Sequence, residues 1–257
     1  MYPHSLSIKA LFSQSYIRWD ATLALISRQG TIFDRFYRDF LIKWEQKDEW
    51  SFFELTGCPG DLLVHLFCLA ELAKQKELAS SMEWLTFNMT PIENIERKVI
   101  EWQNEMAPQI LEDEEQIHDQ QDRYHCAEAW RYSVLIYIER VFKWDRQQQR
   151  PFSIAQFTRT TLDHVRSCRR TSQTQKQLLL PVFLAGSETT DADMRGLVKG
   201  YCKHWAEKSR YNMFGSASRL LDEIWTASPS QWWGAFIDVK TKSSKGSCGM
   251  VTQFLFG

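Results

Sequence analysis

Apolar residues recur along most of this chain every three or four positions, the spacing that places them on one face of an α-helix. Residues 5–28 and 31–44 both follow this pattern and are rich in aromatic side chains. Gly57, Pro59 and Gly60 then interrupt it, which predicts a helix boundary at Gly60, with Asp61 as the cap of the next helix. The apolar residues of that helix share one face: Leu62, Leu63, Leu66, Leu69, Ala70 and Ala73.

A second helix start is predicted at Thr90. The Thr90 hydroxyl could accept a hydrogen bond from the main chain, Pro91 suits the first helical position, and the Glu93 carboxylate could reach back to the cap. Pro108 should end or kink this helix, and residues 111–125 follow as a polar helical stretch. The side chains that this helix is expected to bury are Ile92, Ile95, Val99, Trp102 and Met106.

Residues 126–144 carry apolar side chains all round the helix, which predicts a central position in the core. Arg131, Glu139 and Arg140 lie within this segment. Because an unpaired buried charge costs several kcal/mol, each should have an ion partner or lie at the edge of the core. A further helix is predicted over residues 153–168.

The segment of residues 178–225 predicts three successive helices. The first reads LLLPVFLAG and is apolar throughout, so it should lie in the interior, and two amphipathic helices follow. Asp191 and Asp193 stand at the start of the second, where acidic side chains complement the helix dipole, with Thr189 or Thr190 as the cap. Arg195 is expected to pair with Glu188 or another acidic residue.

The C-terminal segment changes character after a turn at residues 227–230. Two β-prone runs, residues 237–242 and 250–256, flank Gly246 and Gly249 and could pair as a short hairpin that docks against the helices. Taken together, the patterns predict an all-α fold, with residues 1–257 forming a single helical-bundle-like domain that ends in this hairpin.

Composition narrows the classes of function. With 257 residues, 44% of them hydrophobic, the chain can build a large core, and its formal net charge of -1 offers no basic field for nucleic acid. No run approaches the roughly 18 apolar residues that could span a membrane. The cysteines form no CxxC pair, which indicates free thiols in a reducing compartment: Cys58, Cys68, Cys126, Cys168, Cys202 and Cys248.

Two patterns could indicate metal chemistry. His118, Asp122 and His125 share a helix face at ligand spacing, but the stretch is polar throughout, which favours an exposed helix over a zinc site. The acidic run at residues 112–115 could bind magnesium in a terpenoid-cyclase-like enzyme, yet the second acidic cluster that such enzymes need is missing. No complete nucleotide-binding or nucleophile motif is present either, so no metal, cofactor or catalytic residue is expected.

Four segments resemble the regulatory domain of fungal zinc binuclear cluster transcription factors. Its second and third helices are matched by Arg195 with Trp205, and by Leu220, Leu221, Glu223 and Trp225. Its GCP-plus-leucine-helix and A-R-LLY elements resemble residues 52–73 and 126–142, and its dWr element resembles residues 231–233. The residues that match its first helix, LL-P-F-AG-E, are Leu179, Leu180, Pro181, Phe183, Ala185, Gly186 and Glu188.

This resemblance implies a nuclear regulator of transcription that is not an enzyme. It would sense an apolar small-molecule effector or a partner, form homodimers, recruit transcriptional coregulators, and reach DNA only through a zinc cluster domain that this chain lacks. The alternatives are an interaction and dimerisation domain without a ligand, or a terpenoid-type helical enzyme. The aromatic residues that could line an effector pocket are Trp130, Tyr137, Phe183, Tyr201, Trp205, Phe214, Trp225 and Phe254, with Gly246 and Gly249 in the tail loop.

Overall fold

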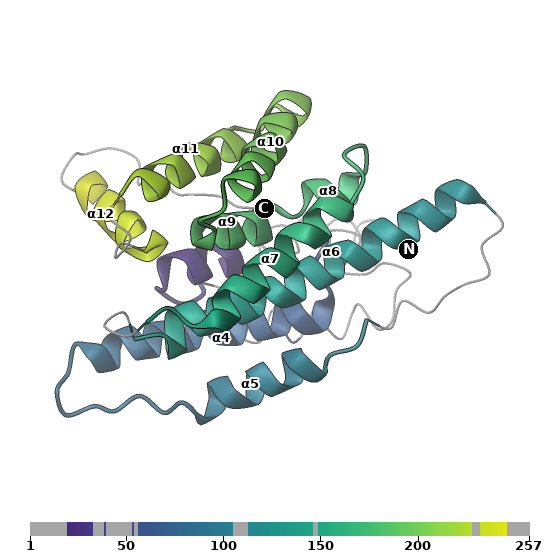
Figure 1. The fold of residues 1–257 in the computed structure, drawn as a ribbon. Coiled ribbons are helices and arrows are strands. Elements are labelled where there is room, and N and C mark those ends of the chain that lie inside the picture. Colours follow the sequence, from purple (N-terminus) through teal and green to yellow (C-terminus); the bar gives the residue numbers. More distant parts are fainter. Residues whose placement is uncertain are drawn as a thin grey trace, which may run out of the picture.

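All regular secondary structure in the described part of the chain is helical, which confirms the all-α prediction (Figure 1). The computed structural model describes residues 20–32, 39, 53, 56–104, 113–145, 149–227 and 232–245, with side chains in the last range described to residue 239. Residues 20–27 are helical. The later helices are α4 (Gly60–Ser80), α5 (Thr90–Glu101), α6 (Glu114–Ile138), the π-helix η1 (Glu139–Lys143), α7 (Phe152–Ser167), α8 (Gln173–Lys176), α9 (Leu179–Glu188), α10 (Ala192–Ser209), α11 (Asn212–Thr226) and α12 (Trp233–Lys245).

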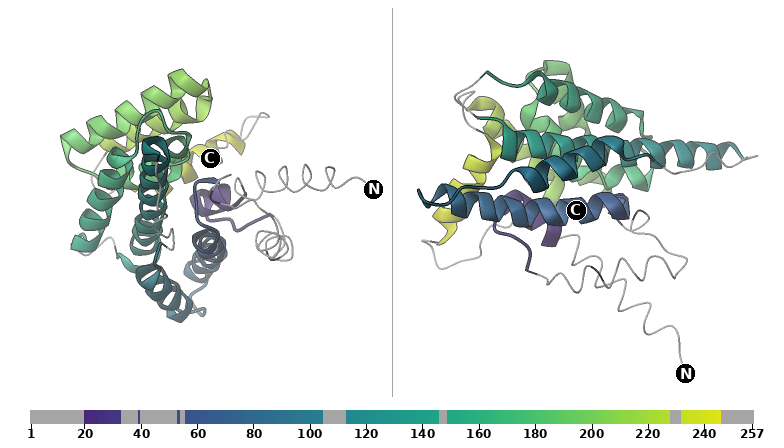
Figure 2. Two further views of the ribbon diagram at one scale, coloured as in Figure 1. Left: turned by 90° about the vertical axis from the view of Figure 1, so that its right-hand side faces the viewer. Right: turned by 90° about the horizontal axis from the view of Figure 1, so that it is seen from below.

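The short helix α9 lies at the centre of the arrangement. It contacts α6 and α7 on one side and α10 and α11 on the other. Figure 2 shows α10 and α11 on one side of the molecule and α4 and α5 on the opposite side. Every α9 residue except Ser187 is buried, so the predicted interior position of this segment is confirmed. Helix α9 therefore lies between the pair α6 and α7 and the pair α10 and α11.

Gly186 allows this close packing near the end of α9. A Cβ atom at this position would lie 3.1 Å from Val198 Cγ1 on α10 and 3.4 Å from Leu221 Cδ1 on α11. A larger residue would push both helices outward, because packed cores tolerate little extra volume. The glycine of the AG-E motif is thus explained by the contact of three helices.

The charged residues predicted within the central helix all have ion partners. Arg131 Nη2 lies 2.7 Å from Glu128 Oε2, and Glu139 Oε1 lies 2.8 Å from Lys143 Nζ. Arg140 Nε lies 2.9 Å from Glu188 Oε1 on α9, and both of these side chains are buried. The expectation that buried charges here are paired is confirmed.

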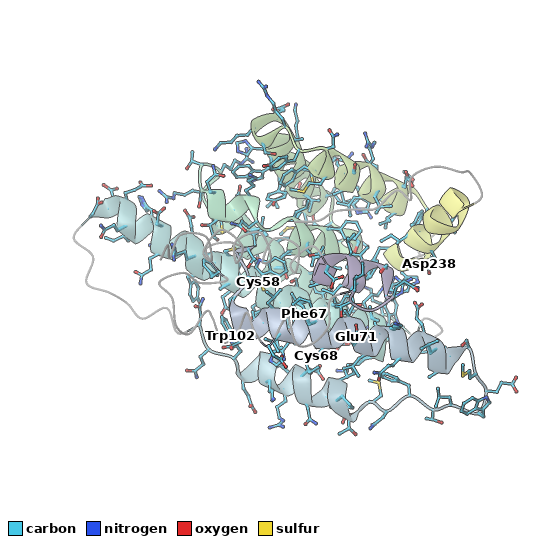
Figure 3. All side chains as sticks on the ribbon, turned by 180° about the vertical axis from the view of Figure 1, so that it is seen from behind. Cys58, Phe67, Cys68, Glu71, Trp102 and Asp238 are labelled. Carbon is cyan, nitrogen blue, oxygen red and sulfur yellow. The ribbon has the colours of Figure 1, made fainter. Side chains whose placement is uncertain are left out.

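Arg28 joins the N-terminal helical residues to α4 and α12. Its side chain is 1% exposed, and its guanidinium lies 2.5 Å from Glu77 Oε1 on α4 and 2.5 Å from Asp238 Oδ1 on α12. Figure 3 labels Asp238 on α12. The guanidinium also lies over the Trp232 ring, 4.9 Å from its centroid. One buried cation thus joins the beginning and the end of the described chain.

The predicted strand over residues 237–242 is wrong, because these residues are helical in α12. Trp233 and Ile237 lie one helical turn apart, and both are buried. Burying them on one face stabilises the helix more than the local β preference of the segment opposes it. Gly246, Gly249, Phe254 and the second predicted strand lie outside the described residues.

The helix starts at residues 60 and 90 are confirmed, but the predicted caps are wrong. Helix α4 has no side-chain cap, and Asp61 lies in its first turn, where its charge complements the helix dipole. At α5, Asn88 Oδ1 accepts a hydrogen bond from the Thr90 amide at 3.0 Å, so the hydroxyl of Thr90 does not act as the cap. A side chain before the first turn reaches the exposed amides more directly than one inside it.

The buried face of α5 is confirmed for Ile92, Ile95 and Val99. Trp102 follows the last residue of the helix and is half-buried against the core. Met106 lies outside the described residues.

The cap of α10 is Asp191, and neither of the predicted threonines takes this role. Asp191 Oδ1 accepts from the amides of Asp193 at 2.8 Å and Met194 at 3.2 Å. The Thr189 hydroxyl instead accepts from the Asp191 amide at 3.3 Å. A carboxylate offers the exposed amides a charged acceptor, which a threonine hydroxyl cannot match.

Candidate functional site

A cavity of about 350 Å³ lies where η1, α10 and α11 meet the end of α9. Its wall combines charged, hydroxyl and apolar groups. The residues that line it are Arg140, Trp144, Arg150, Ser187, Glu188, Thr189, Thr190, Arg195, Ile224, Trp225 and Ala227. A second cavity of about 200 Å³ shares Arg150, Glu188, Thr189 and Thr190 with it.

Glu188 is the acidic residue among the described residues of this wall. Its Oε1 lies 2.9 Å from Arg140 Nε, close enough for an ion pair although not aligned as a hydrogen bond. Its Oε2 lies 3.5 Å from Arg150 Nη2, which also donates to the main-chain oxygen of Glu188 at 2.6 Å. Burial raises the pKa of Glu188, while Arg140 and Arg150 oppose that rise.

Arg195 and Trp225 form another part of the wall. Arg195 Nε donates to the main-chain oxygen of Thr189 at 3.1 Å, and its guanidinium lies over the Trp225 ring at 5.2 Å. Trp225 Nε1 donates to the main-chain oxygen of Gly186 at 2.8 Å. The predicted Arg195–Glu188 pair is wrong, because Arg140 and Arg150 reach that carboxylate instead.

The candidate aromatic residues do not gather in one place. Trp225 lines the 350 Å³ cavity, and Tyr201 lines a separate one of about 60 Å³ together with Gln175 and His204. The other described candidates are buried within the hydrophobic core: Trp130, Tyr137, Phe183, Trp205 and Phe214. Phe254 lies outside the described residues, and a ligand-binding role for the whole set stays a prediction.

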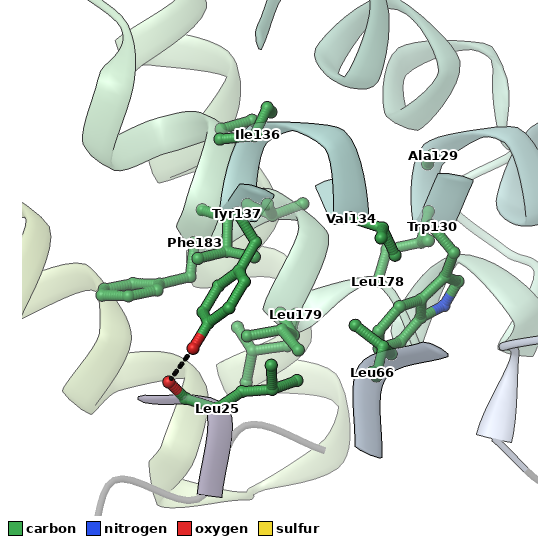
Figure 4. Packing of buried hydrophobic residues seen from close by; sticks show 14 of the residues in the cluster. Leu25, Leu66, Ala129, Trp130, Val134, Ile136, Tyr137, Leu178, Leu179 and Phe183 are labelled. Atoms are coloured by element: carbon green, nitrogen blue, oxygen red, sulfur yellow. Dashed lines mark hydrogen bonds between the residues drawn. The ribbon is translucent and has the colours of Figure 1, made fainter. Parts of the chain in front are cut away.

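Two groups of these buried aromatics are visible in Figure 4. Tyr137 lies near Phe183 and donates its hydroxyl to the main-chain oxygen of Leu25 at 2.9 Å. Trp130 lies apart from them, beside Leu66 and Leu178. Each group joins helices that are distant in the sequence, which is a packing role that requires no ligand.

Among the described residues that line the cavity, Trp225 is the one that the sequence analysis predicts for a pocket, and the others are missed as site residues, including Arg140, Trp144 and Arg150. The sequence marks Arg140 only as a buried charge that needs a partner. It lies in η1, where the Trp144 amide donates to the Glu139 oxygen at 2.8 Å, a bond to the fifth residue back instead of the fourth. Such π-helical turns are frequent at functional sites, but no sequence pattern predicted this one.

The histidine and aspartate constellation on α6 is divided between two other interactions. Asp122 is buried and accepts hydrogen bonds from the Arg169 amide at 2.8 Å and Nε at 2.7 Å, so the exposed-helix interpretation is wrong at this residue. His125 pairs with His164 on α7, with 2.9 Å between their Nδ1 atoms. Within the described residues, no group of three or more His, Cys, Asp or Glu side chains is placed to hold a metal ion.

The histidine pair leads to a prediction about acid stability. Burial, with help from His125 and Arg131, lowers the pKa of His164 to about 4. The unfolded chain takes up this proton near pH 6.5, so the stability that the neutral pair provides should fall progressively between about pH 6.5 and pH 4. Urea midpoints should therefore decline over this range, and less steeply in His164→Leu. The control His204→Leu should keep the wild-type decline, and an unchanged slope in His164→Leu would contradict the assignment.

The structure is that of an all-α protein in which residues of three sequence motifs, Glu188, Arg195 and Trp225, meet at one cavity. A family model for the fungal specific transcription factor domain matches residues 4–240, so this chain belongs to that family. Its role lies in the regulation of transcription, and the family points to the nucleus and is not known for catalysis. No curated protein and no solved structure matches the chain.

Across the described residues, no helix is both long enough and apolar enough to pass through a membrane. No disulfide bond joins any two of the five cysteines whose placement is described, and Cys248 lies outside the described residues.

Proposed function

We propose that the chain acts as one regulatory unit of a transcription factor and that a small-molecule effector controls it through the 350 Å³ cavity. The observation that supports this proposal is the convergence of the motif residues Glu188, Arg195 and Trp225 on that cavity. DNA would be contacted by a separate zinc cluster domain. A volume of this size is at the lower end of the range for small-molecule sites, about 300–1,000 Å³.

A ligand in this cavity would contact η1, α10 and α11 at the same time, and so could favour one relative arrangement of them. The Arg140 guanidinium lies over the Trp144 ring at 4.1 Å and within 5.8 Å of the Trp232 ring centroid. Trp232 in turn contacts Arg28, which links α4 and α12. A tenfold shift between two arrangements requires a difference of only about 1.4 kcal/mol in ligand binding.

Filling the cavity should disrupt this control. Ala227 lines the cavity at the end of α11, so Ala227→Trp would place an indole ring inside it. With the chain fused to a DNA-binding domain, this variant should change basal reporter transcription several-fold and abolish any response to an effector. Its neighbour Thr226 is exposed and does not line the cavity, so Thr226→Trp is the matched control and should behave as wild type. Equal behaviour of the two variants, at equal protein levels, would count against the proposal.

The proposed partners are a second copy of the chain and transcriptional coregulators. Large apolar side chains are exposed near the connection between α4 and α5, where Trp84 is 80% exposed and Leu78, Met82 and Leu85 are also exposed. Apolar clusters at a surface often mark protein contacts. Light scattering over a range of concentrations, applied to the wild type and to Ala227→Trp, measures the molar mass and so tests the homodimer. If the mass stays that of one chain, only the coregulators would remain as proposed partners.

A further inference from the structure

The cavity that the proposed function invokes carries an excess of positive charge. Arg140, Arg150 and Arg195 face it from three different parts of the chain, and Glu188 is the one acidic residue among the described residues that line it. Three positive charges therefore stand against one negative charge. A cavity wall of one dominant sign attracts a ligand of the opposite sign.

The excess is concentrated at one part of the wall. The Glu188 carboxylate lies 2.9 Å from Arg140 and 3.5 Å from Arg150, so two arginines share one carboxylate. Arg195 contacts only a neutral carbonyl oxygen and the face of Trp225, and no carboxylate of the described residues pairs with it. Lys199, which also lies over Trp225, is already paired with Asp222 at 2.7 Å. Arg195 is thus the cation with the greatest capacity to bind an anion.

The rest of the wall has a different chemistry. Apolar surface comes from Ile224 and Trp225 of α11 and from Ala227 directly after it, and Thr190 also lines the wall. A guanidinium binds a carboxylate through two parallel hydrogen bonds, whereas an aromatic and aliphatic wall accepts a hydrocarbon body. We propose, on the basis of the effector function above, that the ligand is a small amphipathic carboxylate whose acid group binds Arg195 and Arg150 and whose apolar body lies along α11.

Matched pairs of ligands can test this charge requirement. A panel of aromatic and aliphatic carboxylates of six to eleven carbons, among them 2-naphthoate, would be compared with the primary amides of the same compounds by calorimetry and ligand-observed NMR. Each amide keeps the apolar body and loses the charge. At least one carboxylate should bind about tenfold more tightly than its amide, and its affinity should fall as salt increases.

Two arginine variants locate the binding group. Arg195→Gln keeps a polar side chain but removes the charge, and should weaken carboxylate binding about tenfold while leaving amide binding unchanged. Arg219→Gln is the control, because Arg219 is an exposed residue of α11 that contacts Ser216 and does not line the cavity.

The outcomes separate this inference from the proposed function. If the amides bind as tightly as the acids, or if no carboxylate in the panel binds, the anionic ligand class is wrong. The reporter response of Ala227→Trp would then still decide whether the cavity regulates transcription. If Ala227→Trp blocks binding but leaves transcription unchanged, the ligand class holds and the regulatory role fails.

Discussion

Trp205→Ala is expected to lower the free energy of unfolding by about 3–5 kcal/mol, the usual cost of removing a large buried aromatic side chain. The Trp205 side chain is 1% exposed in the core between α10 and its neighbours. Its Nε1 donates to Gln175 Oε1 at 3.0 Å, and Gln175 Nε2 donates in turn to the Cys168 oxygen at 2.9 Å. The alanine variant would therefore leave both a void and a buried amide oxygen without its donor.

Phe152→Ala provides the control, since an aromatic side chain is again cut back to alanine, but at a residue that is 81% exposed. It should alter stability by no more than about 0.5 kcal/mol. Urea unfolding followed by circular dichroism at 222 nm measures both variants. A small effect of Trp205→Ala would mean that the indole is not part of the packed core, and would strengthen its interpretation as a ligand contact.

Glu188→Leu is expected to cost about 3–5 kcal/mol, because it removes one partner of a buried ion pair. The side chains of Arg140 and Glu188 are 6% and 5% exposed. The variant would leave Arg140 without the carboxylate of Glu188, and Arg150 would lose the same partner. Thermal and urea unfolding of the purified chain should both show the loss.

Replacing both partners should cost less than replacing Glu188 alone. In Arg140→Met with Glu188→Leu, neither charge is left in the core, and apolar replacements of similar size often restore the stability that a broken pair loses. The four proteins form a double-mutant cycle, whose coupling energy should exceed about 1 kcal/mol. Additive effects of the two changes would show that the pair contributes no mutual stabilisation.

Within the core, the sequence was sufficient to predict the buried helices where the local apolar pattern agrees with the burial in the structure. The apolar run of α9 and the all-round apolar pattern after Cys126 could only be buried, and the structure confirms both. Breakers at Gly60 and Pro91 placed two helix starts correctly. The prediction failed at residues 237–242, where a β-prone composition met a helix whose Trp233 and Ile237 pack into the core.

By itself, the sequence determined the helical class of this protein, its central helices and its family motifs, because helical periodicity and burial are properties of neighbouring positions. The sequence also predicted that Arg140 needs an ion partner, but it did not identify the residue that provides it. Only the tertiary structure decided that Arg140, Arg150, Glu188, Arg195 and Trp225 share one cavity. These residues are up to 85 positions apart, and their distances depend on how whole helices pack, which no local pattern encodes.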